Sequence, residues 1–155
     1  MVAVPLGPLQ RRRVLASPTY LDTHPTPKKP QDLMEHDCIR QRLSGRARFF
    51  EWAFAVKKQR VTPDVSGRLV FDEMRAVLDA ARQGCGLAYV FEPFAAPHIR
   101  SGTLVPLLDK FSPPAEAFHL YYPARSMMPG KLRAFLEFMR ETHAARDTTL
   151  VPAPT

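Results

Sequence analysis

The stretch from Gly67 onward alternates between strand-like and helix-like segments, and this alternation limits the fold more than any other feature of the sequence. Residues 68–71 (RLVF) predict a strand, and apolar residues then recur at helical spacing from residue 74 to residue 81. Residues 87–90 predict the next strand, and Glu92 opens a second helix that ends near residue 100. Strands that alternate with helices are typical of an α/β domain with a parallel sheet.

The preceding half of the chain consists of shorter elements. Residues 13–16 form an apolar run that predicts a buried strand, after which Ser17 and Pro18 predict the N-cap and the first position of a short helix. Residues 38–42 predict a second strand. Large apolar side chains alternate with smaller or polar ones over residues 50–56, and the polar turn after them predicts a hairpin with residues 61–65 as its return strand.

Six segments of the sequence resemble, in order and at similar spacing, those of the effector-binding domains of LysR-type transcription regulators. They are residues 1–4 (MVAV), 14–21 (VLASPTYL), 30–39 (PQDLMEHDCI), 80–89 (AARQGCGLAY), 101–105 (SGTLV) and 118–123 (FHLYYP). Together these segments extend the resemblance from residue 1 to about residue 140. The resemblance implies a two-lobed α/β fold of the periplasmic-binding-protein type II kind, with a small-molecule effector held between the lobes.

The same resemblance implies how the chain is divided. Residues 1–12 correspond to a remnant of the first lobe and its crossover, and residues 13–112 to an essentially complete second lobe. Residues 113–143 correspond to the return strand and last helix of a partial first lobe, followed by a disordered tail over residues 144–155. The family's winged helix-turn-helix is not found. We therefore expect an effector-sensing module that is truncated and does not bind a specific operator by itself.

The candidate effector site follows from a general rule and from the resemblance. Open α/β sheets bind ligands at the carboxyl ends of their strands, and the family's cleft is lined from the same loops. The candidate effector-binding residues are Ser17, Arg40, Gln41, Arg42, Phe71, Asp72, Phe91 and Glu92. Arg40 and Arg42 suit a small anionic effector, because a guanidinium holds a carboxylate through two hydrogen bonds.

These candidates also have purely structural interpretations. Arg40 and Arg42 read equally well as a solvated pair on an edge strand. Ser17 and Asp72 occupy positions where helix N-caps belong, and such a cap contributes ~1 kcal/mol of stability. An acidic Asp72 would also disfavour an anionic ligand unless it is paired.

The sequence shows no constellation typical of an enzyme, a metal centre or a cofactor site. No two of the five histidines stand four residues apart, and neither a phosphate-binding glycine loop nor a nucleophile elbow is present. The two cysteines, Cys38 and Cys85, are isolated and are expected to be reduced thiols in the core. We expect a protein that is not an enzyme and has no metal or cofactor.

Charge and hydropathy leave two alternatives open. The net charge of +7 would suit a basic nucleic-acid-associated protein, although the arginines are spread along the chain. The fold would also suit a free-standing small-molecule binding protein. No apolar run approaches the ~20 residues of a membrane span, and the N-terminus does not resemble a secretory signal, so we expect a cytoplasmic protein.

The last predicted helix begins at Pro129 and has an apolar face that must pack against another surface. Its apolar face carries Leu132, Phe135, Leu136 and Met139. If the sheet beneath it belongs to an incomplete lobe, this face favours a homo-oligomer or aggregation through exposed first-lobe surfaces. Alternatively, the helix folds back on the second lobe or on strands at residues 2–4 and 118–122.

Overall fold

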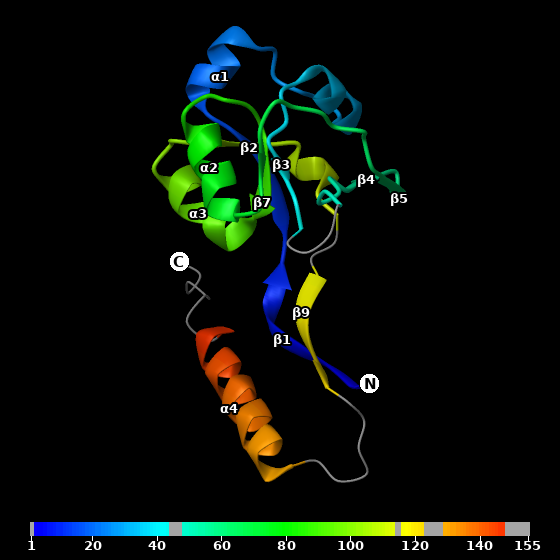
Figure 1. The fold of residues 1–155 in the computed structure, drawn as a ribbon, viewed down its shortest axis with the longest axis vertical. Helices are drawn as coiled ribbons and strands as arrows, with labels where there is room; N and C mark the ends of the chain where they lie inside the picture. The colour runs from blue at the N-terminus through cyan, green and yellow to red at the C-terminus, as the bar shows by residue number, and fades with distance from the viewer. Residues whose placement is uncertain (1, 44–47, 114–115, 123–128, 148–155) are drawn as a thin grey trace, which may run out of the picture. The chain divides into compact units, whose positions relative to one another are not determined.

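The computed structural model describes residues 2–43, 48–113, 116–122 and 129–147 (Figure 1). The chain divides into two compact units: Arg11–Pro114 forms one, and Met1–Gln10 with Ala115–Thr155 forms the other. Within the described residues, no helix is long and apolar enough to cross a membrane.

The larger unit is built around a mixed sheet. Its central strand β2 (Arg12–Ala16) pairs antiparallel with β7 (Ala88–Phe91) on one side and with β8 (Val105–Leu107) on the other. β2 is therefore antiparallel to both of its neighbours, and the parallel sheet predicted from the strands after Gly67 did not anticipate this direction. The physical reason is that β2 follows directly on strand β1 (Val2–Gln10) in the sequence, so no crossover helix dictates its direction.

Parallel pairing appears among the remaining strands. β3 (Arg40–Gln41) pairs parallel with β6 (Val70–Phe71), and Cys38 forms a parallel bridge with Leu87 at the start of β7. β3, β6, β7 and β8 consequently run in one direction, and only β2 opposes them. This part of the α/β prediction is confirmed.

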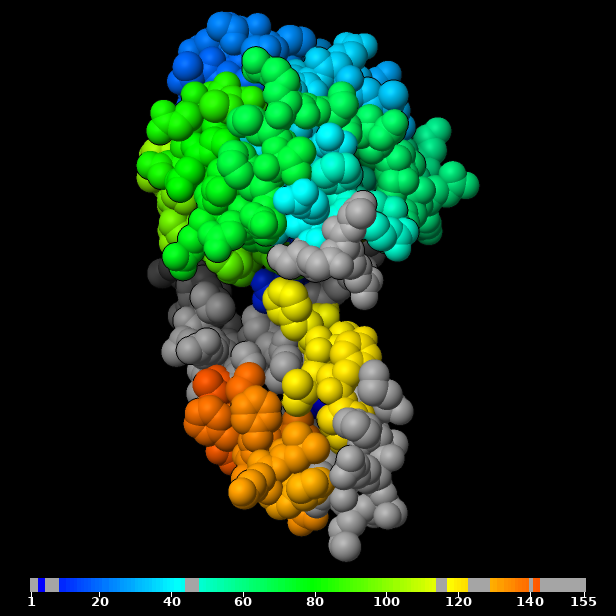
Figure 2. All heavy atoms as spheres, in the orientation of Figure 1, coloured from blue at the N-terminus to red at the C-terminus, as the bar shows by residue number. Residues whose placement is uncertain are grey.

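Two helices cover one face of this sheet. α2 (Met74–Arg82) and α3 (Glu92–Arg100) lie on the same side of β2 and β7 (Figure 1), and α2 forms part of the unit's outer surface (Figure 2). The apolar residues beneath them are Leu15, Ile39, Val77, Leu78, Ala81, Ala88, Val90, Ala95 and Leu104. Burial of each larger side chain in such a cluster contributes ~1.5–3 kcal/mol.

The start of α2 differs from the prediction. Its N-cap position is Glu73, whose side chain makes no capping hydrogen bond, and Asp72 lies outside the helix with an exposed side chain. The prediction of Asp72 as the N-cap was wrong, because residues 72–73 form a bend between β6 and the helix.

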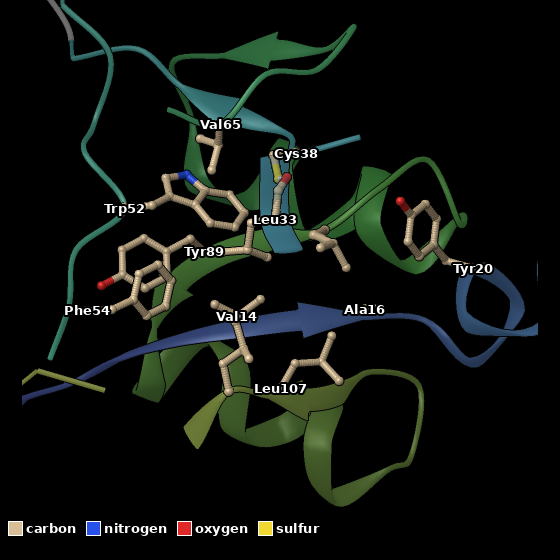
Figure 3. Packing of buried hydrophobic residues seen from close by; sticks show 12 residues of the cluster. Val14, Ala16, Tyr20, Leu33, Cys38, Trp52, Phe54, Val65, Tyr89 and Leu107 are labelled. Atoms are coloured by element: carbon tan, nitrogen blue, oxygen red, sulfur yellow. Dashed lines mark hydrogen bonds between the residues drawn. The ribbon is translucent and has the colours of Figure 1, made fainter. Parts of the chain in front are cut away.

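Short elements and an aromatic cluster cover the opposite face (Figure 3). Tyr89 lies at its centre: its ring centroid is 5.2 Å from that of Trp52 and 5.7 Å from that of Phe54, and its hydroxyl donates to the Ala53 carbonyl at 2.9 Å. α1 (Pro18–Thr23) and the 3-10 helix η1 (Pro30–Glu35) complete this side through Tyr20 and Leu33.

The predicted hairpin is present but shorter than expected. β4 (Phe54–Val56) and β5 (Gln59–Val61) pair across Lys57 and Lys58, which adopt positive φ values of 50° and 66°. This two-residue turn matches the twist of paired strands. Residues 50–53 are not a strand, because Trp52 and Ala53 pack on the sheet face instead of pairing with a neighbouring strand.

Two glycines permit close packing beside Cys38. A Cβ atom at Gly67 would lie 2.1 Å from the Cys38 carbonyl oxygen, and one at Gly86 would lie 2.2 Å from the Asp37 carbonyl oxygen. Gly86 also has a φ of 153°. No larger residue fits at either position without moving backbone atoms.

The smaller unit contains a ribbon and one helix. β1 pairs antiparallel with β9 (Glu116–Tyr122), with a register shift between Leu6 and Gln10, and α4 (Gly130–Asp147) packs on β1. Leu136 is 5% exposed, whereas Phe135 and Phe138 are 47% and 61% exposed. The predicted packing of the last helix on these strands is thus confirmed for Leu136, whereas Phe135 is not covered by them. Because α4 reaches Asp147, the predicted tail begins too early at residue 144, and residues 148–155 lie outside the described residues.

Candidate functional site

The carboxyl ends of three parallel strands meet at one edge of the larger unit. β3 ends at Gln41, β6 at Phe71 and β7 at Phe91. Since β2 runs in the opposite direction, its amino end lies at this edge, where Arg12 pairs with Phe91. Arg12 and Arg13 were not among the predicted site residues, and only the direction of β2 would have revealed them.

Ser17 lies at the opposite edge, so its predicted grouping with the other candidates was wrong. It follows the carboxyl end of β2, which is the one reversed strand. Its side chain is 2% exposed, and its Oγ accepts a hydrogen bond from the Tyr20 backbone at 3.2 Å. The structure therefore shows Ser17 as the N-cap of α1.

Arg40 is held against an aromatic ring at the candidate edge. Its guanidinium carbon lies 4.0 Å from the centroid of the Phe49 ring. Its Nε is buried and has no hydrogen-bond partner in the part of the chain that the structure describes. A buried donor without an acceptor is costly, so this atom is suited to bind an added acceptor.

Gln41, Arg42 and Asp72 lie beside Arg40. The Gln41 Nε2 donates to the Asp72 backbone carbonyl at 3.5 Å, and the Arg42 backbone donates to the Phe71 carbonyl at 2.8 Å. The side chains of Arg42 and Asp72 are exposed. Phe71 packs with the cluster under α2 and α3, so its ring belongs to the core on the other face of the sheet.

Glu92 is already engaged by a neighbouring arginine. Its Oε1 accepts from the Nε of Arg13 at 3.2 Å, and the same guanidinium contacts Asp109 Oδ1 at 2.7 Å. The hydrogen bond that Arg13 donates to Glu92 is the main cause that raises the pKa of Arg13. Arg13 thus joins the start of α3 to the 3-10 helix η2 (Asp109–Phe111), and Glu92 is paired with Arg13 at this edge.

Phe91 is part of an aromatic enclosure around Arg12. The Arg12 guanidinium carbon lies 3.3 Å from the Phe50 ring centroid and 3.9 Å from that of Phe91. Such stacking restricts the orientation of the Arg12 guanidinium.

A second polar cluster surrounds Tyr20. Its hydroxyl lies 3.0 Å from His36 Nδ1, and its ring stacks on His24 with centroids 4.0 Å apart. Burial is the main cause that lowers the pKa of His36. Among the described residues, no three His, Cys, Asp or Glu side chains are grouped so that they could hold a metal ion.

The two cysteines lie in different environments. Cys38 is fully buried, and this burial raises the pKa of its thiol to about 12, so the thiol stays protonated at neutral pH. Cys85 is only half-buried. The expectation of a core position is confirmed for Cys38 alone.

Comparisons with known proteins agree with this architecture. The family model of the LysR substrate binding domain matches residues 1–144. A putative transcriptional regulator of Pseudomonas aeruginosa is 36% identical over 150 residues, covering 97% of this chain and 49% of the relative. The putative LysR family substrate binding domain-containing protein YagP of Escherichia coli is 31% identical over 106 residues, covering 68% of this chain and 78% of the relative.

Solved structures show the same fold. CrgA, a LysR-type transcriptional regulator from Neisseria meningitidis, matches with a TM-score of 0.70 and 27% identity over 91% of this chain and 47% of CrgA. This chain spans about half the length of CrgA and of the Pseudomonas relative. The predicted α/β fold of the periplasmic-binding-protein type II kind is confirmed. The chain belongs to the LysR family of transcriptional regulators and carries the effector-binding domain of that family, in agreement with the main functional prediction.

Proposed function

We propose that this chain senses a small anionic effector at the strand-end edge that carries Arg40, Gln41 and Arg42. The family's substrate-binding domain binds small-molecule effectors. The environment of the Arg40 side chain is the observation that supports an anionic effector. Its guanidinium is stacked on Phe49, and its buried Nε has no acceptor within the described residues.

An effector carboxylate would remove the cost of this arrangement. A buried donor that lacks a partner costs ~1–3 kcal/mol, and a hydrogen bond from a charged donor contributes ~1.5–3 kcal/mol. Because the Phe49 ring lies over one face of the guanidinium, an acceptor would approach in its plane, where two N–H groups can bind one carboxylate. Arg42 supplies further donors, since it lies two residues after Arg40 and its side chain starts from the same face of the chain.

We further propose how this activity fits into the protein. Arg11–Pro114 acts as the second lobe, and the unit of Met1–Gln10 and Ala115–Thr155 contributes to the first. The site binds its ligand without transforming it, so the chain acts as a sensor rather than an enzyme. It works in the cytoplasm, where a transcription regulator acts on DNA, and effector binding changes transcription through the DNA-binding domain typical of such regulators.

The proposal is tested by calorimetric titration of the full chain with small carboxylates and with inorganic phosphate. Arg40→Ala should weaken binding of any anion that the wild type binds by ~1–3 kcal/mol through the loss of a charge-assisted contact. Arg100→Ala is the matched control, because this exposed arginine ends α3 at the opposite edge of the sheet.

The two variants separate local binding from general electrostatics. Equal weakening in Arg40→Ala and Arg100→Ala would mean that the anion responds only to net charge. Unchanged affinity in Arg40→Ala would remove this residue from the site.

A further inference from the structure

Exposed apolar side chains flank Arg40 at the candidate edge. The ring of Phe49, which lies 4.0 Å from the Arg40 guanidinium carbon, is 43% exposed, and Val70 is 37% exposed. A single exposed apolar residue is ordinary on a protein surface. Here two of them lie beside a guanidinium whose buried Nε has no acceptor within the described residues. The edge therefore offers a ligand apolar surface as well as a positive charge.

Strand pairing brings four of these side chains onto one surface. Arg40 is directly opposite Val70 in the parallel pair of β3 and β6, and Arg42 is directly opposite Phe49 in an antiparallel bridge. Residues opposite each other on paired strands point to the same side, and so do residues two apart along one strand. Both neighbours of Val70 along β6 pack with the cluster under the helices, so Val70 points away from that cluster. We call Arg40, Arg42, Phe49 and Val70 the Arg40 patch.

The charges around the Arg40 patch favour a ligand with one carboxylate. The carboxylate of Asp72 is exposed and follows the end of β6, two residues after Val70. It would repel a second negative charge that extends from Arg40 along β6. A ligand body without charge avoids this repulsion, and it can cover the exposed parts of Phe49 and Val70 at the same time.

We propose that the effector is a monocarboxylate with an uncharged apolar body, bound through its carboxylate at Arg40 and through its body on Phe49 and Val70. This inference deepens the proposed function and rests on it. Full burial of one methylene group strengthens binding about fourfold. A ligand on the Arg40 patch is covered on one side only, so we expect about half of that free energy, which corresponds to about twofold per methylene group.

The test is a titration of the full chain with acetate, butyrate, hexanoate and phenylacetate, and with succinate as the dianion. Dissociation constants are taken from the chemical-shift changes in nuclear magnetic resonance spectra. For the wild type, affinity should rise about fourfold from acetate to butyrate and again from butyrate to hexanoate, since each step adds two methylene groups. Phenylacetate should bind more tightly than acetate, and succinate no more tightly than butyrate.

Variants separate the contribution of the charge from that of the apolar surface. Val70→Thr replaces one methyl group by a hydroxyl in a side chain of the same shape, so it should reduce the gain per methylene group and leave acetate affinity unchanged. Arg40→Ala should weaken all the monocarboxylates by a similar factor and keep the gain. Phe49→Ser should reduce both, because the ring also contacts Arg40. Met34→Ser is the matched control and should change neither, since this exposed apolar residue lies in η1, before the amino end of β3.

The outcomes distinguish this inference from the proposed function. If all the carboxylates bind equally and Arg40→Ala weakens them, the apolar body is wrong and the anion site at Arg40 stands. Tighter binding of succinate than of hexanoate also overturns the inference. If Val70→Thr and Phe49→Ser keep the gain per methylene group but lower the mass measured by light scattering, the Arg40 patch is a contact between copies of the chain instead. If no carboxylate binds the wild type, both proposals fail.

Discussion

The arginines at the strand-end edge differ in what each side chain contacts, although all have the same chemistry. Arg13 is paired with two carboxylates, Arg12 lies between two rings, and Arg40 stacks on one ring with a buried donor that lacks an acceptor in the described structure. We therefore expect Arg13 to stabilise the fold, and we propose a binding role only for Arg40.

Removing Arg13 should lower the free energy of unfolding. Arg13→Ala leaves Glu92 and Asp109 without their shared partner, and the side chain of Arg13 is only 21% exposed. We expect a loss of about 1–3 kcal/mol in urea unfolding. Arg82→Ala is the control: its pair with Asp79 is an exposed pair within one helix, which contributes ~0.3–0.5 kcal/mol. Equal losses in the two variants would contradict the assigned role of Arg13.

His36 should make the fold sensitive to mild acid. Burial lowers the pKa of His36, so the folded state favours the neutral ring. The contribution of His36 to the free energy of unfolding is fully present above the pKa of ~6.5 that the ring has in the unfolded state. It is lost as the pH falls from there through the lower pKa of the folded state. Asp37 N–H donates to the Tyr20 hydroxyl at 3.3 Å, which leaves the hydroxyl proton for His36 Nδ1, and a protonated ring cannot accept it.

The check is urea unfolding of the wild type and His36→Gln between pH 7.5 and pH 5. The wild type should lose more stability over this range than His36→Gln, because glutamine does not titrate. His119→Gln, at an exposed position on β9, is the control and should keep the wild-type dependence. Parallel pH profiles for the wild type and His36→Gln would show that His36 is not the group involved.

At the scale of the elements, backbone contact beside β3 depends on the absence of a side chain at Gly67. Gly67→Ala would place a Cβ atom 2.1 Å from the Cys38 carbonyl oxygen, so the segment or the strand must move. We expect a loss of about 3 kcal/mol or more in urea unfolding. Gly130→Ala meets nothing within 4 Å and should change stability little. A Gly67→Ala protein as stable as Gly130→Ala would mean that the two segments are not in this contact.

The sequence predicted the elements whose signal is local. α2 and α3 follow from apolar spacing within a few residues, and so does the strand before each of them. The direction of β2 does not follow from local spacing, because its partners β7 and β8 lie more than seventy residues away along the chain. The reversed direction of β2 explains both errors at the site. It places Ser17 at the edge opposite the other candidates, and it places Arg12, which was not predicted, at the candidate edge.

The other misplaced features also depend on contacts distant in sequence. Aspartate is a residue type that favours helix N-caps, but the bend after β6 places the N-cap of α2 at Glu73, one residue after Asp72. Phe71 ends its strand as predicted, yet its ring packs with the core under the helices. Glu92 was correctly expected at the edge, and its pairing with Arg13 depends on the β2–β7 register.

At the scale of the whole molecule, the unit of Met1–Gln10 and Ala115–Thr155 should promote self-association. Tyr121, Phe135 and Phe138 are 62%, 47% and 61% exposed, and β1 and β9 pair only with each other among the described strands. A two-stranded ribbon with exposed aromatic rings is marginally stable without further cover. Light scattering coupled to gel filtration should show a mass that rises with concentration.

Two substitutions on α4 separate surface from core in that experiment. Phe138→Ser should shift the protein toward the monomer, because the ring is exposed. Leu136→Ser should instead lower stability, because this side chain is 5% exposed. A wild-type protein that stays monomeric at all concentrations would contradict the prediction and would mean that the unit is covered within one chain.

The most direct test of the central claim is the side-chain N–H signal of Arg40, followed by nuclear magnetic resonance during titration with succinate and butyrate. The signal is assigned by its absence in Arg40→Lys. We predict a downfield shift of the Arg40 Nε–H proton that saturates with binding, since a carboxylate supplies the acceptor that this buried donor lacks in the described structure. Saturable binding of either carboxylate with an unmoved Arg40 signal would contradict the account.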